Sequence, residues 1–468
     1  MARVWSVLLV PVLSAPILLG AEALRSRRSA VTFSESVAPI LYANCVTCHR
    51  PGEAAPFSLI SYEDAGKRGK LIAKVTGSRY MPPWHAAHGY GEFADERRLT
   101  DAQIETIAAW VAQGMPEGDP HRMPALPAFP DGWHLGTPDL VLQMPAGYEL
   151  PASGPDVYRN FAIPTHLTEN KWVRGIEFHP SARRVVHHVL FAYDSSGVAA
   201  RMDGRDGRPG FGGMGTAGIG GVTGASGPLG GWAVGATPVF LPQGVALALP
   251  KGSDLILQMH FHLTGKPETE QSIIGIYFAD KAPDRRVWSV QVPALFGFGA
   301  GIDIPAGEPH YVIEDSLTLP VDVKALSIAA HAHYLAKEMK ATATLPDGSP
   351  QPLLWIPDWD FNWQDRYTYK APVMLPKGTR IDVRLTYDNS TDNPRNPSAP
   401  PKEVHWGEQS FDEMGSVIMA VQCVRVEDEP VLQKAFADRV RATIARAQAD
   451  GTLKRYLAQR AERGGGSR

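Results

Sequence analysis

The stretch SIAAHAHYLAKEM, residues 327–339, places two histidines one position apart in an apolar segment. Side chains at positions i and i+2 of a β-strand lie on the same face. In a strand, His331 and His333 would therefore point the same way, roughly 6.5–7 Å apart, and could hold one metal ion. The alternative is a pair of half-exposed polar residues on a sheet surface, so the surrounding sequence has to decide.

Short alternating runs of the same kind fill residues 156–427. Examples are KWVRGIEFHP, DLILQMHFHL, VWSVQVPAL and RIDVRLTYDN, which are separated by Gly, Pro, Asn and Asp. This pattern predicts two antiparallel, jelly-roll-like β-sandwiches, at residues 156–290 and 291–427. The glycine-rich stretch 210–231 interrupts the pattern and is expected to be a mobile loop that does not pack.

The β-rich region carries several further potential metal ligands. RRVVHHVLFAYD contains His187 and His188, DLILQMHFHLTG contains His260 and His262, and EQSFDEMGSVIMAV contains Met414. Imidazole suits copper, and a thioether favours Cu(I). A set of three histidines and a set of two histidines with a methionine would make two unlike copper sites. We interpret the histidines beside prolines or in turns as structural or surface residues, namely His121, His166, His179, His310 and His405.

The order of these motifs resembles one known family. The succession H-H, L-Q-M-H, H-x-H-x-L-x-K and D-E-M, together with GGWAVGATPVFLPQGV and IDIPAGE, is similar to the copper type II, ascorbate-dependent monooxygenases. That family includes the peptidylglycine α-hydroxylating and dopamine β-monooxygenases, and the resemblance covers residues 138–427. The resemblance implies an electron-transfer copper site formed by His187, His188 and His260. It also implies an oxygen-binding, catalytic copper site, across a solvent-filled cleft from the first, formed by His331, His333 and Met414.

Three features depart from the family pattern. The peptide-hydroxylating members carry an arginine two residues before the H-x-H motif, where this chain has Ala329. They also carry a tyrosine four residues after the ligand methionine, where this chain has Ile418. The family's catalytic domains use several disulfides, for which this chain has no cysteines available. Peptidylglycine is therefore not the expected substrate.

Two details of the histidine pattern lead to separate expectations. Because neighbouring residues on a regular strand point to opposite faces, His187 and His188 can share a metal only if the strand bulges or ends there. His262 shares a strand face with His260, so it either contacts a ligand from behind or acts as an alternative ligand.

A different motif stands near the N-terminus. YANCVTCHRPGEAAPF contains Cys45-x-x-Cys48-His49, the attachment motif for c-type haem, in which the thiols bond to the haem vinyl groups and the histidine ligates the iron. A thioredoxin-like redox pair would need a βαβ context, and a zinc site would need a second Cys pair. The sequence shows neither, so haem attachment is the prediction.

The other iron ligand is expected in the same small domain. Met81 lies in SRYMPPWHAAH, where two prolines hold the chain extended after it. One alternative is that Met81 is a core residue, and another is that His85 or His88 ligates the iron. TDAQIETIAAWVAQG predicts a closing helix, capped by Thr100, whose apolar face is formed by Ile104, Ile107, Ala108 and Val111.

Residues 31–120 thus resemble a small all-α class I cytochrome c domain. The proline-rich residues 121–155 are expected to be a linker that wraps onto the next domain.

Residues 1–23 have the pattern of a secretory signal peptide, with Arg3, an apolar run broken by prolines and an A-x-A cleavage site. Cleavage would leave an exported, periplasmic or extracellular protein, whereas an uncleaved segment would tether it. The sequence contains no second run of about 18 apolar residues, so it predicts no integral membrane domain. The net charge of −3 and the lack of clustered Lys and Arg argue against nucleic-acid binding.

The C-terminal residues 428–468 are expected to form a helix and a tail. Leu432, Phe436, Val440 and Ile444 recur every four residues until Gly451 breaks the run. With three cysteines in 468 residues the protein is not held together by disulfides, and Cys423 is expected to be an inert buried thiol.

The sequence therefore predicts an exported multidomain oxidoreductase with a covalent haem c and two copper ions. The haem domain would replace or supplement ascorbate as donor to the three-histidine copper, and a C–H bond of a small organic substrate would be hydroxylated with O₂ at the methionine-containing site. Ascorbate or another redox protein would supply the electrons from outside. Two alternatives stay open: a non-enzymatic electron-transfer or copper-handling protein on the same scaffold, and a cytochrome fused to a metal-free sandwich used for adhesion.

Overall fold

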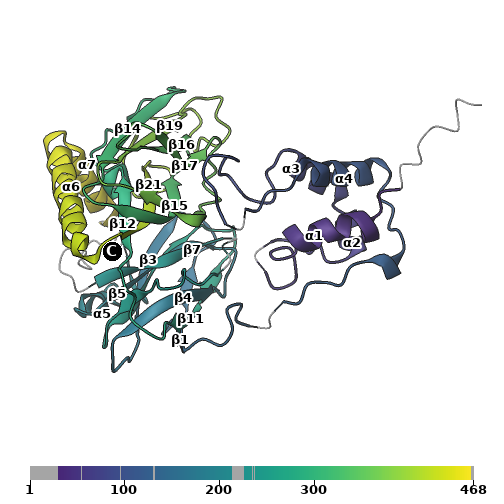
Figure 1. The fold of residues 1–468 in the computed structure, drawn as a ribbon, viewed down its shortest axis with the longest axis horizontal. Helices are drawn as coiled ribbons and strands as arrows, with labels where there is room; N and C mark the ends of the chain where they lie inside the picture. Colours follow the sequence, from purple (N-terminus) through teal and green to yellow (C-terminus); the bar gives the residue numbers. More distant parts are fainter. Residues whose placement is uncertain are drawn as a thin grey trace, which may run out of the picture.

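A computed structural model describes residues 30–53, 55–94, 96–129, 132–212, 226–234, 236 and 238–464. The predicted signal segment, residues 1–23, and residues 213–225 of the glycine-rich stretch lie outside these ranges. The described chain is mostly antiparallel β-sheet, with short helices towards the N-terminus and two helices at the C-terminal end (Figure 1). The prediction of a β-rich protein with a C-terminal helix is confirmed.

The first sandwich packs a four-stranded sheet, in the order β1-β11-β4-β8, against a five-stranded sheet, in the order β6-β3-β9-β5-β7. Side chains from both sheets, including Val173, Ile274, Leu257 and Phe191, form one buried core. The four-stranded sheet consists of β1 (Leu140–Gln143), β4 (Lys171–His179), β8 (Leu247–Leu249) and β11 (Ile273–Phe278). The five-stranded sheet consists of β3 (Val157–Pro164), β5 (Val186–Asp194), β6 (Phe211–Gly212), β7 (Ser226–Ala233) and β9 (Asp254–Phe261). A two-stranded sheet is formed by β2 (Tyr148–Leu150) and β10 (Glu268–Glu270).

The second sandwich packs two four-stranded sheets, in the orders β12-β21-β15-β18 and β14-β19-β16-β17. Its core includes Ile328, Met339, Leu385 and Cys423, so the predicted burial of this thiol is confirmed. The first sheet consists of β12 (Trp288–Val292), β15 (Val323–Ala332), β18 (Arg366–Leu375) and β21 (Gly415–Cys423). The second consists of β14 (Tyr311–Thr318), β16 (Ala336–Thr344), β17 (Pro350–Ile356) and β19 (Arg380–Tyr387). A short pair is formed by β13 (Asp303–Ile304) and β20 (Val404–His405).

Two segments differ from the sequence-based expectation. Strands β1 and β2 lie within residues 121–155, so the predicted linker contributes in part to the sheets. Both described ends of the glycine-rich stretch are also strands, β6 and β7, and not a loop. Gly231 shows why glycine is used there, because a Cβ at this position would lie 2.9 Å from the Val189 carbonyl oxygen on the neighbouring strand.

The N-terminal helical segment has its own apolar core, which includes Phe33, Leu41, Ile107 and Trp110. The helices are a π-helical turn (Phe33–Val37), α1 (Ala38–Asn44), α2 (Tyr62–Gly66), α3 (Gly69–Gly77) and α4 (Asp101–Ala112). Thr100 caps α4, as predicted, and the structure adds a capping box in which Gln103 is the partner. The predicted inner face of α4 is wrong at Ala108, which is exposed, because Trp110 fills the core.

Residues 84–97 attach this segment to the second sandwich. Phe93 forms an antiparallel bridge with Tyr369 of β18. The Ala94 N–H donates to the Thr368 carbonyl at 2.7 Å, and the Lys370 N–H donates to the Glu92 carbonyl at 3.0 Å. Phe93 is buried in the core of the second sandwich, so the attachment combines backbone pairing with apolar packing.

The predicted C-terminal helix is two helices, α6 (Glu429–Ala449) and α7 (Thr452–Gly464), separated at Gly451 with φ +85°. Leu432 is fully buried, but Ile444 is 41% exposed and Ala447 is buried in its place. A spacing of four residues advances about 40° beyond a full turn each time, so the predicted stripe drifts away from the packed face.

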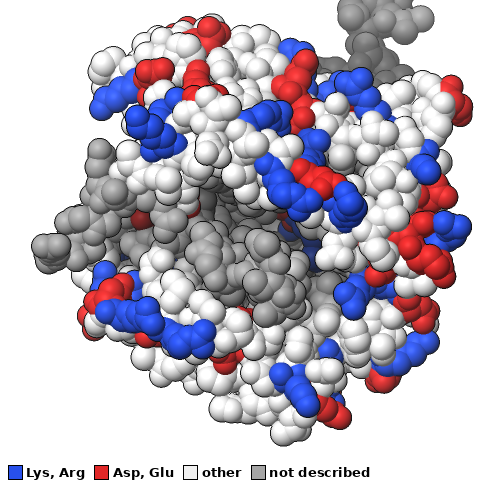
Figure 2. Space-filling view, turned by 90° about the vertical axis from the view of Figure 1, so that its left-hand side faces the viewer, with Lys and Arg blue, Asp and Glu red and all other residues white. Residues whose placement is uncertain are grey.

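On the face of the molecule in Figure 2, Lys and Arg are interspersed with Asp and Glu.

The remaining helical turns are short: Pro120–Arg122, α5 (Val198–Met202), Ala294–Gly297 and Val426–Asp428. Within the described ranges, no helix has the length and apolar character needed to cross a membrane.

Candidate metal sites

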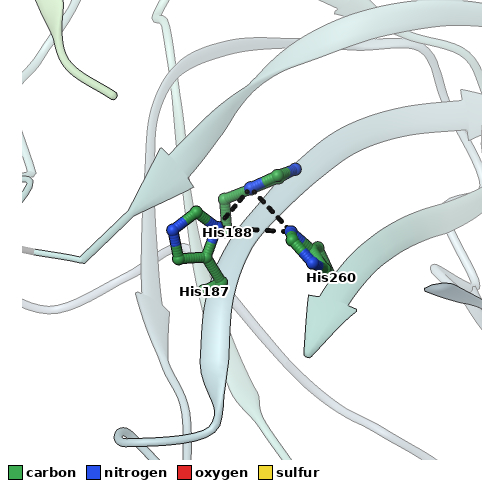
Figure 3. Close-up of side chains that lie close together, drawn as sticks. All are labelled: His187, His188 and His260. Carbon is green, nitrogen blue, oxygen red and sulfur yellow. Dashed lines mark hydrogen bonds between the residues drawn. The ribbon is translucent and has the colours of Figure 1, made fainter. Parts of the chain in front are cut away.

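Three imidazoles converge in the five-stranded sheet of the first sandwich. The Nδ1 atoms of His187 and His188 lie 3.1 Å apart, and they lie 3.2 and 3.4 Å, respectively, from Nδ1 of His260 (Figure 3). His187 and His188 come from β5, and His260 comes from the neighbouring strand β9. The three histidines that the sequence predicts as one site are therefore brought together.

A β-bulge lets two successive histidines share this site. The register between β5 and β9 shifts between Val186 and His188, and His188 pairs directly with His260. An extra residue in one strand changes the direction of the next side chain. The predicted requirement that the strand bulge or end at this pair is confirmed.

Asp156 orients the third imidazole. Nε2 of His260 donates to Asp156 Oδ2 at 3.0 Å, so the lone pair of His260 is on Nδ1, which faces the other two rings. Nδ1 of His262 donates to the other carboxylate oxygen at 3.0 Å, and Ser410 of the second sandwich also contacts Asp156. Of the two roles expected for His262, the structure places it behind the ligand set.

These nitrogens fit a metal better than they fit one another. Nδ1 of His260 carries a lone pair and can only accept a hydrogen bond. Because a ring N–H donates in one direction, hydrogen bonds alone cannot satisfy all three contacts between these nitrogens. Two ligand nitrogens about 2.0 Å from one metal at a tetrahedral angle lie about 3.3 Å apart. The observed separations of 3.1 to 3.4 Å match that value.

The second set lies in the second sandwich. Nε2 of His331, on β15, lies 3.2 Å from Sδ of Met414, which directly precedes β21. The rings of His331 and His333 have centroids 5.3 Å apart. The structure thus brings the predicted His-His-Met set together, with a thioether that favours Cu(I).

Hydrogen bonds fix which ring nitrogens of this set face a metal. Nδ1 of His331 donates to Gln364 Oε1 at 2.6 Å, and the Gln364 amide is itself oriented by donating to the Phe361 carbonyl. Nδ1 of His333 donates to the Asp412 carbonyl at 3.2 Å. Both Nε2 atoms therefore keep their lone pairs for a metal ion.

Glu413 connects the segment that carries His331 and His333 to the ligand Met414. Its carboxylate is fully buried and accepts from the backbone N–H groups of His333, Leu335 and Met414, at 2.6 to 2.9 Å. Burial raises the pKa of Glu413 to about 8, although these hydrogen bonds act in the opposite direction. One side chain thus ties the H-x-H turn to the ligand methionine.

Burial keeps the candidate ligands neutral. It lowers the pKa of His331 to about 4, and together with the charge of His260 it lowers the pKa of His187 to about 3. The pKa values of His188 and His333 also lie well below the usual range for the same reason. Neutral imidazole is the form that binds metals, so the sites are poised to bind them at physiological pH.

The two sets lie against each other. The ring centroids of His188 and His331 are 6.3 Å apart, and Phe361 stacks on His187 at 4.7 Å and contacts His333 at 5.8 Å. The family resemblance implies a solvent-filled cleft between the sites, but among the described residues the buried Phe361 ring occupies that position.

The motif predicted to attach haem, Cys45-x-x-Cys48-His49, forms a tight turn. The backbone N–H groups of Cys48 and His49 both donate to the Cys45 carbonyl. Nδ1 of His49 donates to the Phe57 carbonyl at 3.1 Å, which leaves Nε2 for an iron ligand. Both thiols are free, and burial raises the pKa of Cys45 to about 12. These residues are compatible with covalent haem attachment.

Met81 lines a small surface hollow with Arg97 and Leu99. The hollow is also lined by Thr76, Pro82 and Ile104, and none of the residues of the Cys45-x-x-Cys48-His49 motif lines it. Ligation of iron by Met81 stays a prediction. Of the two alternatives, His85 bonds to the Asp358 carbonyl and His88 pairs with Glu96 at the surface.

A further cluster of side chains that could bind a metal lies outside the two ligand sets. Oε1 of Glu177 accepts from Nδ1 of His134 and Nε2 of His179, each at 2.8 Å, and Oε2 accepts from the Leu135 N–H and the Tyr277 hydroxyl. Hydrogen bonds to His179 and His134 outweigh burial and lower the pKa of Glu177 to about 2. Because the carboxylate already accepts these donors, we interpret the cluster as a polar anchor.

Several contributors were not identifiable from the sequence. Asp156, Phe361, Gln364 and Glu413 lie in loops or at strand ends, where no periodic pattern marks them. Only Glu413 had a local signal, since it precedes the ligand methionine within the D-E-M motif.

The chain matches no protein-family model and no curated protein. Among solved structures it is similar to the infectious bursal disease virus VP2 subviral particle, with 11% identity over 65% of this chain and 75% of that chain and a TM-score of 0.17. It is also similar to infectious bursal disease virus Gt strain, with 11% identity over 60% of this chain and 70% of that chain and a TM-score of 0.16. Likenesses this weak carry no argument about fold or function.

Proposed function

We propose that this chain is an exported haem- and copper-containing oxidoreductase that hydroxylates a C–H bond of an organic substrate with O₂. One oxygen atom would enter the product and the other would leave as water, which consumes two electrons and two protons. Residues 31–120 would form a cytochrome c-like domain, and the two sandwiches would each hold one copper ion.

The observation that carries this proposal is the pair of unlike ligand sets at one place. Three Nδ1 atoms lie within 3.1 to 3.4 Å of one another in the first sandwich, and an imidazole lies 3.2 Å from a thioether in the second. The motif order that resembles the copper monooxygenases supports the same assignment. Copper at the methionine-containing site would supply O₂ binding and one-electron chemistry.

The ligand residues have distinct tasks in this proposal. His187, His188 and His260 would hold the electron-transfer copper, with Asp156 fixing the ring orientation of His260. The oxygen-binding copper would be held by His331, His333 and Met414. Cys45 and Cys48 would bond the haem, and its iron would be ligated by His49 and Met81.

The substrate end of the site differs from that of the peptide-hydroxylating relatives. Two of the three departures from the family pattern, Ala329 and Ile418, are direct cross-strand partners on β15 and β21. Both positions on this pair of strands are therefore apolar. This supports a substrate that is not recognised in the way a peptidylglycine carboxylate would be.

A purified holoprotein tests the proposal. We expect one covalent haem and two copper ions per chain, and O₂ uptake that yields a product carrying one ¹⁸O atom from ¹⁸O₂. The Cys45→Ala/Cys48→Ala variant should lose covalent haem, whereas Cys423→Ala should keep it. Iron without copper would contradict the proposal and favour the adhesion alternative.

One observation favours the non-enzymatic alternative. Phe361 is buried and contacts imidazoles of both sets, which restricts the space for a substrate between them. In an electron-transfer or copper-handling protein, the coppers would cycle between oxidation states without any oxygenated product. Product analysis over a panel of small organic compounds separates the two functions.

A further inference from the structure

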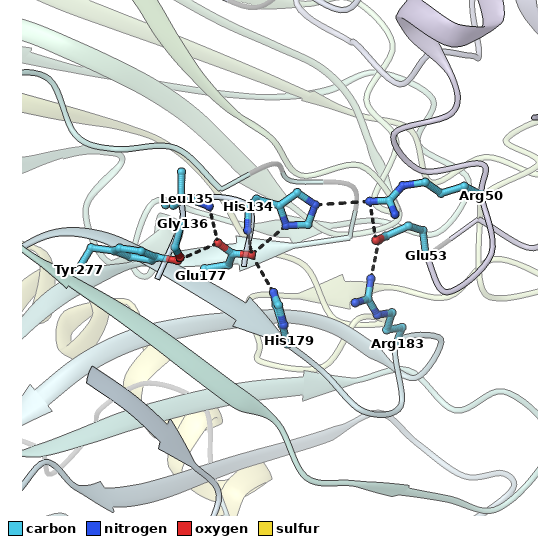
Figure 4. A network of polar contacts seen from close by, with 9 residues as sticks. All are labelled: Arg50, Glu53, His134, Leu135, Gly136, Glu177, His179, Arg183 and Tyr277. Atoms are coloured by element: carbon cyan, nitrogen blue, oxygen red, sulfur yellow. Dashed lines mark hydrogen bonds and ion pairs between the residues drawn. The ribbon is translucent and has the colours of Figure 1, made fainter. Parts of the chain in front are cut away.

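Four charged and polar residues connect the haem-motif loop to the first sandwich. Glu53 Oε2 lies 2.5 Å from Nη1 of Arg183, and Glu53 Oε1 lies 2.9 Å from Nη2 of Arg50 (Figure 4). Nη2 of Arg50 also lies 3.5 Å from Nε2 of His134. We call Arg50, Glu53, His134 and Arg183 the loop bridge. The Glu53 and Arg50 side chains are only 17% and 14% exposed, so these ion pairs are partly shielded from water.

The loop bridge connects two segments that each lie next to a predicted cofactor ligand. Arg50 directly follows His49 of the haem motif, and Glu53 lies three residues further on. Arg183 lies in the turn before β5, four residues ahead of His187. The ion pair between Glu53 and Arg183 is therefore a short connection between the haem-motif loop and the strand of the three-histidine set.

Both partners on the sandwich side are held in place. The turn that carries Arg183 is fixed by the fully buried Glu270, which accepts from the backbone N–H groups of Ser181 and Ala182 at 3.2 and 2.6 Å. His134 donates through Nδ1 to Glu177, so its Nε2 is an acceptor for the Arg50 guanidinium. The haem-motif loop thus meets fixed partners.

The loop bridge is not what attaches the helical segment to the rest of the chain. Residues 84–97 do this through the Phe93–Tyr369 bridge, the burial of Phe93 and the ion pair between Arg97 and Asp365. Loss of the loop bridge would therefore leave the helical segment attached to the second sandwich. Only the orientation of the haem-motif loop towards the first sandwich would change.

We propose that the Glu53–Arg183 ion pair, supported by Arg50 and His134, orients the haem-motif loop towards β5 and thereby sets the rate of electron transfer from haem to the three-histidine copper. The transfer is one electron from ferrous iron to Cu(II), which gives ferric iron and Cu(I), with no other reactant. This inference rests on the proposed function. The four bridge residues act as positioning residues and do not ligate either metal.

Charge reversal tests the proposal in the full-length holoprotein. Glu53→Arg and Arg183→Glu each break the pair, and the double variant restores it with the charges exchanged. Arg425→Glu is the matched control, because Arg425 pairs with Asp428 at the surface of the second sandwich. After rapid photochemical reduction of the haem, we expect its reoxidation by copper to slow at least tenfold in each single variant. The double variant should recover most of the rate, and the control should be unchanged.

A second measurement does not depend on copper. Hydrogen–deuterium exchange of residues 48–59 should be faster in both single variants and restored in the double variant, with unchanged exchange in α4. Unchanged exchange in the single variants would overturn the proposal. It would also be overturned if exchange became faster in a single variant while the rate of haem reoxidation stayed at the wild-type value. If wild-type protein binds both metals but passes no electron between them, the proposed electron path itself is wrong, even where the exchange results hold.

Discussion

His188 and His331 belong to different sandwiches, yet their ring centroids lie 6.3 Å apart. Each belongs to one of the two candidate ligand sets, so ions bound at these sets would be neighbours. Ser410 of the second sandwich also contacts Asp156 of the first, which joins the sandwiches at the same place. The two sites are therefore expected to influence each other.

The first prediction concerns this proximity. In fully copper-loaded, oxidised protein, the electron paramagnetic resonance signal should show dipolar broadening from two nearby Cu(II) ions. The His331→Ala/His333→Ala variant keeps only the three-histidine set, so its copper signal should sharpen to that of an isolated ion. Identical line widths in the two proteins, at their respective full loading, would show that the sites are far apart in solution.

The second prediction concerns Asp156. Burial would raise the pKa of this carboxyl, but hydrogen bonds from His260 and His262 hold it well below its usual range. Removal of an acceptor behind a ligating histidine typically weakens metal binding by about 10- to 100-fold. Asp156→Asn should weaken copper binding by this factor at the three-histidine site alone, as measured by chelator competition. Asp347→Asn, at an exposed turn, should bind copper like the wild type.

The third prediction concerns Met414. Met414→Leu nearly conserves side-chain volume, so we expect a loss of less than about 1.5 kcal/mol in the free energy of unfolding. Loss of the thioether should weaken Cu(I) binding more than Cu(II) binding. A tenfold selective loss would lower the copper reduction potential by about 59 mV. Met339→Leu, in the hydrophobic core of the same sandwich but outside the ligand set, is the control for a redox titration.

The fourth prediction concerns Glu177, whose pKa is lowered to about 2. Glu177→Gln leaves buried donors poorly matched, which should cost about 2 kcal/mol of unfolding free energy at pH 7. Because the pKa is lower in the folded than in the unfolded state, the carboxylate stabilises the fold fully above about pH 4.3 and loses this effect as the pH falls towards 2. Urea midpoints should therefore differ most between wild type and variant at neutral pH.

Glu149→Gln serves as the control for this measurement, since Glu149 is exposed on β2 of the same sandwich. A difference between wild type and Glu177→Gln that stays constant from pH 7 to pH 3 would contradict the lowered pKa.

The sequence was informative where chemistry follows local spacing. Alternating apolar residues predicted the β-rich fold, and the successive residues His187 and His188 predicted a bulge that the β5–β9 register shows. The helix cap at Thr100 was also predicted, because Thr100 directly precedes the helical run that it caps. Such features depend on residues that are close together in the chain.

Tertiary features that depend on distant residues were not predictable in this way. Asp156 lies 104 positions from His260, and nothing near either residue indicates that they meet. Phe361 lies in a loop without periodicity, so its position between the ligand sets follows only from how the sandwiches pack. The stripe predicted for α6 failed for a different reason, because strict four-residue spacing does not follow the 3.6-residue turn of a helix.

The pairing of residues 92–94 with β18 has a practical consequence. β18 is the last strand of its sheet, and the Glu92 and Ala94 backbone groups satisfy polar groups that would otherwise be bare along that edge. A truncated protein that begins at residue 121, designed to isolate the sandwiches, would expose this edge and tend to self-associate. A version in which residues 84–97 are joined by a flexible linker to residue 121, so that α4 with its core residues Ile107 and Trp110 is absent, would keep the edge covered and should stay monomeric to a higher concentration.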